Sequence, residues 1–148
     1  MKRIFTSCRA LTIYQPWAWA IMEGLKPVEN RKWISHHRGP LLIHAGLSMA
    51  SMDRGTEFIS DFEIEVPPRS RLVFGALLGV VDMIDCVSNH RQTKANEKKF
   101  GDWAGDEYLF VLEEPRYFAS PITYSGSQGM FTVTDKSVLR AVEQLYDG

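Results

Sequence analysis

Cysteine is scarce in this chain, which has Cys8 and Cys86 among its 148 residues. They form no C-x-x-C pair and no disulfide framework, so we expect reduced thiols in a cytoplasmic protein. Long apolar runs are also missing. The most apolar stretch, Leu72 to Val81, is about half the ~20 residues that span a membrane, and the first ten residues hold no apolar run of signal-peptide length. From these absences we expect neither a membrane-spanning segment nor a secretory leader.

An excess of one charge sign is missing too. The formal net charge is −1, with 24% charged and 45% hydrophobic residues. That balance disfavours a protein that coats long duplex nucleic acid, although it allows a local basic groove. The length and composition are those of a globular protein with a real core. No repeat, low-complexity tract or linker divides the chain, so residues 1–148 are predicted to form one domain.

What the sequence does contain is concentrated between Leu11 and His44. This stretch includes the string GLKPVENR, which has the spacing G-x-K-x-x-E-x-R from Gly24 to Arg31. Between residues 26 and 38 there are four Lys or Arg and two His, against Glu29 as the one acid. No other part of the chain puts opposite charges so close to aromatic residues and to a turn.

The local fold of this stretch follows from its residues. Gln15-Pro16 is typical of a helix start, and Gly24 of a helix end, because glycine readily adopts the left-handed conformation. From residue 28 the pattern alternates as in a strand, which puts Glu29 and Arg31 on one face with Lys26 just before it.

Aromatic residues surround this charge cluster. Trp17, Trp19 and Trp33 fall within 17 positions, and tryptophan beside cations suits flat, charged ligands. Two plainer interpretations stand beside this one. Tryptophan is also good core material, and a Lys/Glu/Arg cluster at the start of a strand is often a solvated ion-pair surface.

The rest of the chain predicts short strands separated by Gly and Pro turns. Residues 72–87 form a long strand candidate, in which Gly75 and Gly79 indicate bulges or sharp bends. Residues 108–112 form another strand, which Glu114-Pro115 is expected to end. Residues 135–146 have the spacing of an amphipathic terminal helix. Together these patterns predict an α+β domain built on a small mixed β-barrel of five or six strands with flanking helices.

Two further groups of polar residues are candidates for a site. Asp82 and Asp85 lie at opposite parity in a strand, so at most one of them is expected to face a site. His36, His37 and His44 are the sharp candidates for a metal, but no Cys/His ligand spacing is present. We therefore predict no metal and no cofactor.

The strings LTIYQPWAWAIMEGLKPVENRKW, RGPLLIHA, YLFVL and GSQGMF together resemble the ASCH domain family, a branch of the PUA-like β-barrels. The likeness runs from about Leu11 to Val133. Gly24, Lys26, Glu29 and Arg31 match the most specific signature of the family.

The resemblance implies a cleft for RNA or a nucleotide-like ligand. Lys26, Glu29 and Arg31 would line it, Gln15 and Trp17 would sit beside it, and the loop with Ser127 and Gln128 would form its far wall. A branch of the family removes the acetyl group from acetylcytidine with a K-x-x-T pair and a glutamate. Here Glu29 stands where that threonine would be, and a carboxylate is a poorer acyl-transfer nucleophile than an activated hydroxyl. Another branch resembles metal-independent ribonucleases.

Three functions remain open from the sequence. The first is a module that binds single-stranded RNA or a nucleotide, with Trp17 stacking a base. The second is a hydrolase acting on RNA or on a modified nucleoside, with Glu29 as general base and Lys26 stabilising negative charge. The third is a protein-interaction module. The sequence gives neither the ligand nor the oligomeric state.

Overall fold

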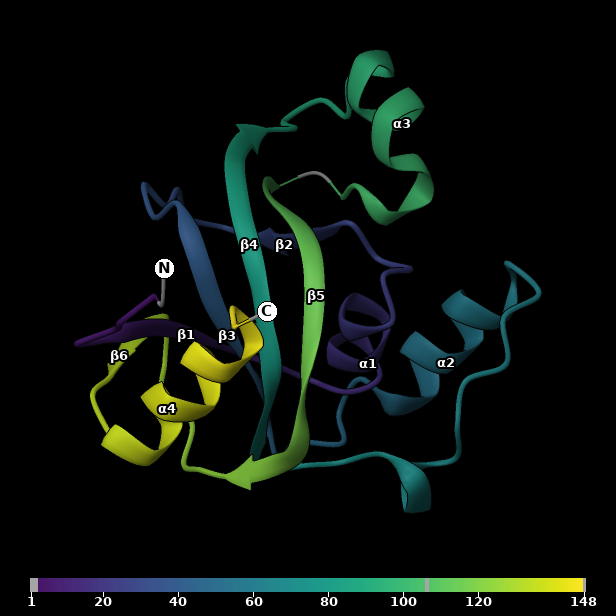
Figure 1. Ribbon diagram of the computed structural model, residues 1–148. Coiled ribbons are helices and arrows are strands. Elements are labelled where there is room, and N and C mark those ends of the chain that lie inside the picture. Colours follow the sequence, from purple (N-terminus) through teal and green to yellow (C-terminus); the bar gives the residue numbers. More distant parts are fainter. Residues whose placement is uncertain (1–2, 106, 148) are drawn as a thin grey trace.

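Figure 1 shows strongly bent strands with helices on both sides of them. The computed structural model describes residues 3–105 and 107–147. The elements follow the chain as β1 (Cys8–Ile13), α1 (Trp17–Met22), β2 (Val28–Arg31), β3 (Gly39–Ala45), α2 (Met52–Ser60), the 3₁₀ turn η1 (Arg69–Arg71), β4 (Ala76–Ser88), α3 (Lys94–Phe100), the 3₁₀ turn η2 (Gly101–Trp103), β5 (Tyr108–Thr123), β6 (Met130–Val133) and α4 (Lys136–Leu145).

One six-stranded sheet organises these elements, in the order β2-β5-β4-β3-β1-β6. β1 and β3 run parallel, and the other neighbouring pairs are antiparallel. A parallel pair needs a long crossover connection, and here that connection carries α1 and β2. The segment that holds the G-x-K-x-x-E-x-R motif is therefore the crossover between two central strands.

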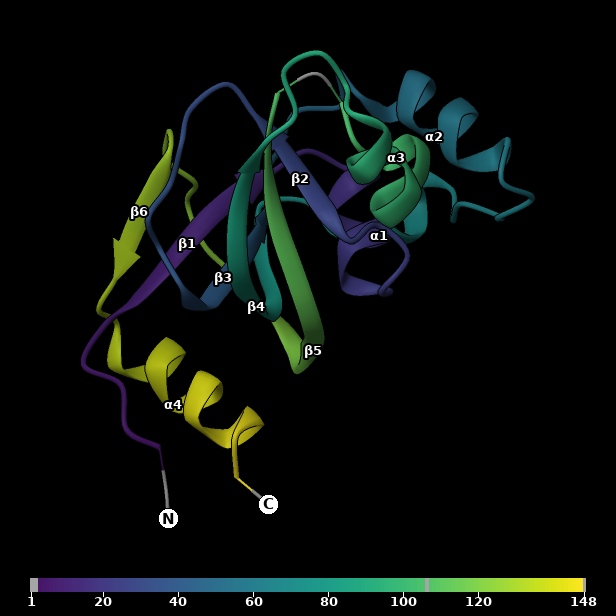
Figure 2. The same cartoon turned by 90° about the horizontal axis from the view of Figure 1, so that it is seen from above.

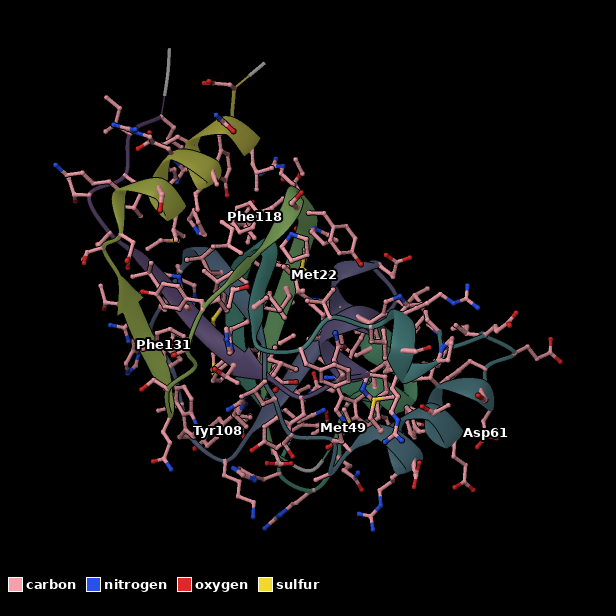
Figure 3. All side chains as sticks on the ribbon, turned by 90° about the horizontal axis from the view of Figure 1, so that it is seen from below. Met22, Met49, Asp61, Tyr108, Phe118 and Phe131 are labelled. Carbon is pink, nitrogen blue, oxygen red and sulfur yellow. The ribbon has the colours of Figure 1, made fainter. Side chains whose placement is uncertain are left out.

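Both faces of the sheet are covered, which explains why β3 and the first half of β4 are continuous apolar runs. α1 packs on the face of the sheet that carries Leu11 and Ile13 of β1, whereas α4 packs on the other face, which carries Ala10. This alternation is the period of two that a strand imposes. Figure 2 shows α1, α2 and α3 gathered at one side and α4 at the other, and Figure 3 shows Phe118 beside α4 and Met22 beside α1.

The predicted α+β class with six strands is confirmed, but the sheet is not closed into a barrel. Within the described residues, β2 and β6 are its two ends and each pairs with a single neighbour. The strands nevertheless curve enough for Arg31 at the end of β2 to donate a hydrogen bond from Nη2 to the carbonyl oxygen of Thr12 in β1, at 2.6 Å. β1 and β2, which a closed barrel would pair, are therefore joined near the motif by a side-chain hydrogen bond and not by a strand ladder.

The prediction that the strand ends at Glu114-Pro115 is wrong. β5 has 16 residues in all and runs through both Pro115 and Pro121. β2 pairs with β5 only up to Val111, so the later residues have β4 as their ladder partner on one side. Proline is tolerated at such an edge, where its missing N–H is not needed. Register shifts between β4 and β5 absorb the irregular backbone, including Glu114 with a φ of 50°.

Neither the helices nor the cysteines suggest a further role. No helix in the described part of the chain is long and apolar enough to cross a membrane. Cys8 and Cys86 are both free thiols. Burial raises the pKa of Cys8 to about 11, so this thiol stays protonated at neutral pH and is a poor nucleophile.

Gly79 lies at a register shift between β4 and β5, as the predicted bulge suggested. A Cβ added there would collide with the backbone carbonyl oxygen of Arg116, which cannot move without shifting β5. We therefore expect Gly79→Ala to lower the free energy of unfolding by about 3 kcal/mol, measured by urea titration.

Gly101→Ala is the control for that experiment. A Cβ at Gly101 would meet nothing within 4 Å, and the φ of 64° is its one source of strain. The expected loss is about 2 kcal/mol, because a φ of 64° with a ψ of −152° is a conformation that glycine alone adopts readily. Equal losses in the two variants would contradict the collision with β5 as an added cost at position 79.

Candidate functional site

The motif begins where α1 ends. Gly24 adopts a φ of 76°, as expected of a helix stop, and the backbone N–H groups of Leu25 and Lys26 both donate to the carbonyl oxygen of Ala20 at 3.0 Å. These two bonds fold the chain back under the helix before Pro27 leads it into β2. The turn thereby directs the side chain of Lys26 inward.

Lys26 is buried, with 5% of its surface exposed. Its Nζ lies 2.6 Å from the carbonyl oxygen of Val28 and 3.0 Å from Glu29 Oε1. It also lies 5.6 Å from the ring centroid of Trp17. A buried ammonium group is stable only when it is paired, and here a carboxylate, a carbonyl and an aromatic ring surround it.

Glu29 joins the two cations of the motif. Its Oε1 accepts from Lys26, and its Oε2 accepts from Nε of Arg31 at 3.0 Å. Glu29 and Arg31 therefore share a strand face, as the alternation predicted. Because Arg31 also bonds to Thr12, the three charged residues link α1, β2 and β1. We call Lys26, Glu29 and Arg31 the charge triad.

Two cavities open over the charge triad, and Trp17 and Glu29 line both of them. The first, which we call the loop cavity, has a volume of about 370 Å³ and is also lined by Thr12, Tyr14, Arg31 and residues 127–129. The second, the aromatic cavity, has a volume of about 390 Å³ and is also lined by Lys26, Asn30, Arg54, Phe58, Asp102 and Trp103. The two cavities adjoin at Trp17 and Glu29, and we call them together the cleft.

A buried histidine positions the wall of the loop cavity. Nε2 of His44 lies 2.6 Å from the carbonyl oxygen of Tyr124. A carbonyl only accepts, so Nε2 carries the hydrogen, and Nδ1 accepts from Thr12 Oγ1 at 3.1 Å. Gly126 passes so close that a Cβ there would lie 2.9 Å from His44 Cε1. This packing delivers Ser127 and Gln128 to the loop cavity, opposite Arg31.

The beginning of the same loop is held from outside. The Tyr124 hydroxyl donates to Asp135 Oδ1 at 2.6 Å, and this hydrogen bond to a carboxylate raises the pKa of Tyr124 above its usual value. The loop is thus attached to β3 on one side and to the residue before α4 on the other.

A half-buried amide, that of Asn30, positions the wall of the aromatic cavity. Asn30 Nδ2 donates to the carbonyl oxygen of Trp103 at 2.9 Å, and Asn30 Oδ1 accepts from the N–H of Gly105 at 2.8 Å. The ring of Trp103 then stacks on Phe62 at 5.0 Å with an angle of 16° between the planes. Phe58 lies 5.5 Å from Trp103 and 5.6 Å from Trp17, which connects α1, α2 and η2 through aromatic contacts.

Sequence reasoning missed the residues of this aromatic wall. Trp103 stands between Gly101 and Gly105, and it is 73 positions after Asn30, so no local pattern relates the two residues. An amide inside the motif was the one available signal, because amides shielded from solvent usually bind backbone groups.

Gln15 was predicted to bind the ligand, and the structure places it elsewhere. Its side chain is 1% exposed and lies outside the linings of both cavities. Nε2 donates to the carbonyl oxygen of Val73 at 3.0 Å, and Oε1 accepts from the N–H of Trp19 at 2.8 Å. Gln15 thus ties the start of α1 to the segment before β4.

The other polar candidates also lie away from the cleft. Asp82 contacts the hydroxyl of Tyr146 at 3.3 Å, and Asp85 lies 3.6 Å from Arg38 on the surface. Among residues 3–105 and 107–147, no three His, Cys, Asp or Glu side chains come together as candidate metal ligands.

These features define a class of protein: an α+β fold with a curved six-stranded sheet, whose cleft has a buried charge triad as its floor. The chain belongs to the ASCH domain family, whose model matches residues 11–125. ASCH domains have a PUA-like fold associated with RNA binding. The match ends before β6 and α4, so Ser127 and Gln128 lie just beyond it.

Two curated relatives share the name Activating signal cointegrator 1. The Homo sapiens protein is 28% identical over 132 residues, and the Mus musculus protein 27% identical over 132 residues. Each alignment covers 85% of this chain and 22% of the relative. The chain therefore spans about a fifth of the length of these relatives.

Among solved structures, a point mutant of the ASCH protein from Zymomonas mobilis superposes with a TM-score of 0.57. It is 14% identical and is matched over 92% of this chain and 94% of that chain. A second point mutant of the same protein gives a TM-score of 0.53 at 13% identity, over 90% and 95% of the two chains. At such identities the likeness shows the fold alone.

Breaking the charge triad is expected to destabilise the fold. Glu29→Ala leaves the Lys26 ammonium buried without its carboxylate, and losing one partner of a buried pair typically costs about 3–5 kcal/mol. The double variant Lys26→Met/Glu29→Ala, which removes both charges, should lose less than Glu29→Ala. Urea unfolding measures both.

Glu114→Ala is the matched control, because its pair with Arg116 at 3.2 Å is largely exposed and should contribute less than about 1 kcal/mol. If Glu29→Ala lowered the free energy of unfolding no more than Glu114→Ala, the charge triad would not contribute to the stability of the fold.

Proposed function

We propose that this chain binds single-stranded RNA, or a nucleotide unit of it, in the joined cleft above the charge triad. The observation that carries the proposal is that Trp17 lines both cavities, with Arg31 lining the loop cavity and Lys26 the aromatic cavity. A cation and an indole ring at one point provide for the phosphate and the base of a nucleotide together.

The local charge of the cleft supports an anionic ligand. Lys26 and Arg31 outnumber Glu29, so the floor carries one net positive charge in a chain whose formal net charge is −1. Arg31 engages Glu29 and Thr12 through Nε and Nη2, and Nη1 has no protein partner within the residues that the structure describes. Arg31 lines the loop cavity together with Ser127 and Gln128, and we propose that a phosphate group binds there.

The size of the cleft favours an unpaired strand. Cavities of about 370 and 390 Å³ are in the range that holds small ligands. A duplex keeps its bases stacked and its edges in grooves, whereas single strands can insert splayed bases into pockets. Two adjoining cavities therefore suit consecutive parts of a single strand.

The hydrolase alternative stays a prediction. Both oxygens of Glu29 already accept hydrogen bonds from cations, which suits a residue that positions Lys26 and Arg31. A general base needs a lone pair directed at the proton that it removes. We base the proposal on binding for this reason, and the protein-interaction alternative likewise stays a prediction.

Arg31→Gln should weaken RNA binding and flatten its salt dependence. One phosphate contact contributes about 0.7 to the slope of log K against log salt for a single strand, so the slope should fall by about that amount. Fluorescence anisotropy with a labelled single-stranded RNA at several salt concentrations measures it.

Arg38→Gln removes an equally charged side chain that pairs with Asp85 outside the cleft, and its slope should match that of the unmodified protein. An unchanged slope in Arg31→Gln would contradict a phosphate contact at this residue.

Trp17→Leu should weaken binding of the same RNA by about 1–3 kcal/mol, the usual contribution of one stacked base. Trp33→Leu is the control, because Trp33 packs on Phe110 in the core at 5.0 Å and lines neither cavity. Equal affinity losses, with both variants folded by circular dichroism, would remove Trp17 from the binding site.

A further inference from the structure

The aromatic cavity combines aromatic walls with two opposite charges that have no partner among the residues that the structure describes. Arg54 of α2 and Asp102 of η2 both line it, together with Phe58 and Trp103. Both charged side chains are exposed, and neither takes part in an ion pair or hydrogen bond within residues 3–105 and 107–147. The rim of the cavity thus offers the parallel N–H donors of a guanidinium group and the two acceptor oxygens of a carboxylate to a ligand that lies against these rings.

We propose that the aromatic cavity is a base pocket that selects guanine, an inference that rests on the proposed function. Guanine carries two acceptors, O6 and N7, side by side on one edge, which a guanidinium group binds in a bidentate manner. Its N1–H and N2–H groups are adjacent donors, which the two oxygens of a carboxylate accept. Arg54 and Asp102 supply these two complementary groups from opposite elements.

The other bases lack this pair of edges. Adenine places an amino donor where guanine has O6, so its N6 would face the guanidinium donors of Arg54. Cytosine also presents an amino donor, and neither pyrimidine has an N7. The smaller pyrimidine rings would also cover less of the aromatic surface of Phe58 and Trp103.

The pocket is built before any ligand arrives. Asn30 holds the backbone on both sides of the turn that carries Trp103, and Phe62 supports the indole ring from one face. Because Trp17 and Glu29 also line the loop cavity, a base in the aromatic cavity would leave its sugar and phosphate directed toward Arg31. The aromatic cavity would then bind the base, and the loop cavity would bind the sugar-phosphate backbone.

Displacement of a labelled single-stranded RNA by the four ribonucleoside 5′-monophosphates tests this proposal. GMP should compete about 10-fold more strongly than AMP, CMP or UMP, as expected for one or two bidentate contacts. Asp102→Asn and Arg54→Lys should each bring GMP to within about threefold of AMP and leave AMP, CMP and UMP unchanged. Lysine keeps the charge at position 54 but loses the fork.

Two control variants change the same chemistry outside the cavity. Asp61→Asn alters an acid at the outer end of α2, which Figure 3 shows pointing away from the sheet, and Arg71→Lys alters an exposed arginine of η1. Both should keep the full preference for GMP.

The outcomes separate the two proposals. Equal competition by all four nucleotides, or a GMP preference that Asp102→Asn and Arg54→Lys leave intact, would overturn guanine selection while RNA binding that depends on Arg31 stands. If the unmodified protein bound neither the labelled RNA nor any nucleotide, the proposed function itself would fail.

Discussion

A carboxylate buried between two cations is the interaction on which the rest of this structure depends. Glu29 holds Lys26 through one oxygen and Arg31 through the other, and Arg31 reaches the backbone of β1. β2 has four residues and lies at one end of the sheet, so little else fixes it relative to β1. The group that positions this strand is also the floor of the cleft, and the two roles cannot be varied independently.

The local part of this arrangement could be predicted from the sequence because it depends on neighbours in the chain. Gly24 ends α1, Pro27 prevents its continuation, and alternation along β2 puts Glu29 and Arg31 on one face. Each of these steps is set within three or four residues by backbone conformation and strand periodicity.

The parts that could not be predicted depend on contacts between distant segments. Trp103 joins the site because Asn30, 73 residues earlier, binds its backbone, and no local pattern encodes that distance. Pro115 would end a central strand, but it is tolerated in β5 because β2 covers only the first residues of that strand. The family resemblance put Gln15 beside the cleft, whereas the tertiary packing shows that its amide group bonds to the backbone of Val73 and Trp19.

If the cleft binds RNA as proposed, stability and selectivity lie in different parts of it. Its floor is a buried ion pair, whereas its two walls are loops held by polar side chains: His44 and Asp135 for residues 124–129, and Asn30 for residues 103–105. Side chains at the surface of a fastened loop can change without disturbing the core. The same floor could thus carry different walls, and the chemistry of the walls, more than that of the motif, would decide which nucleotide is bound.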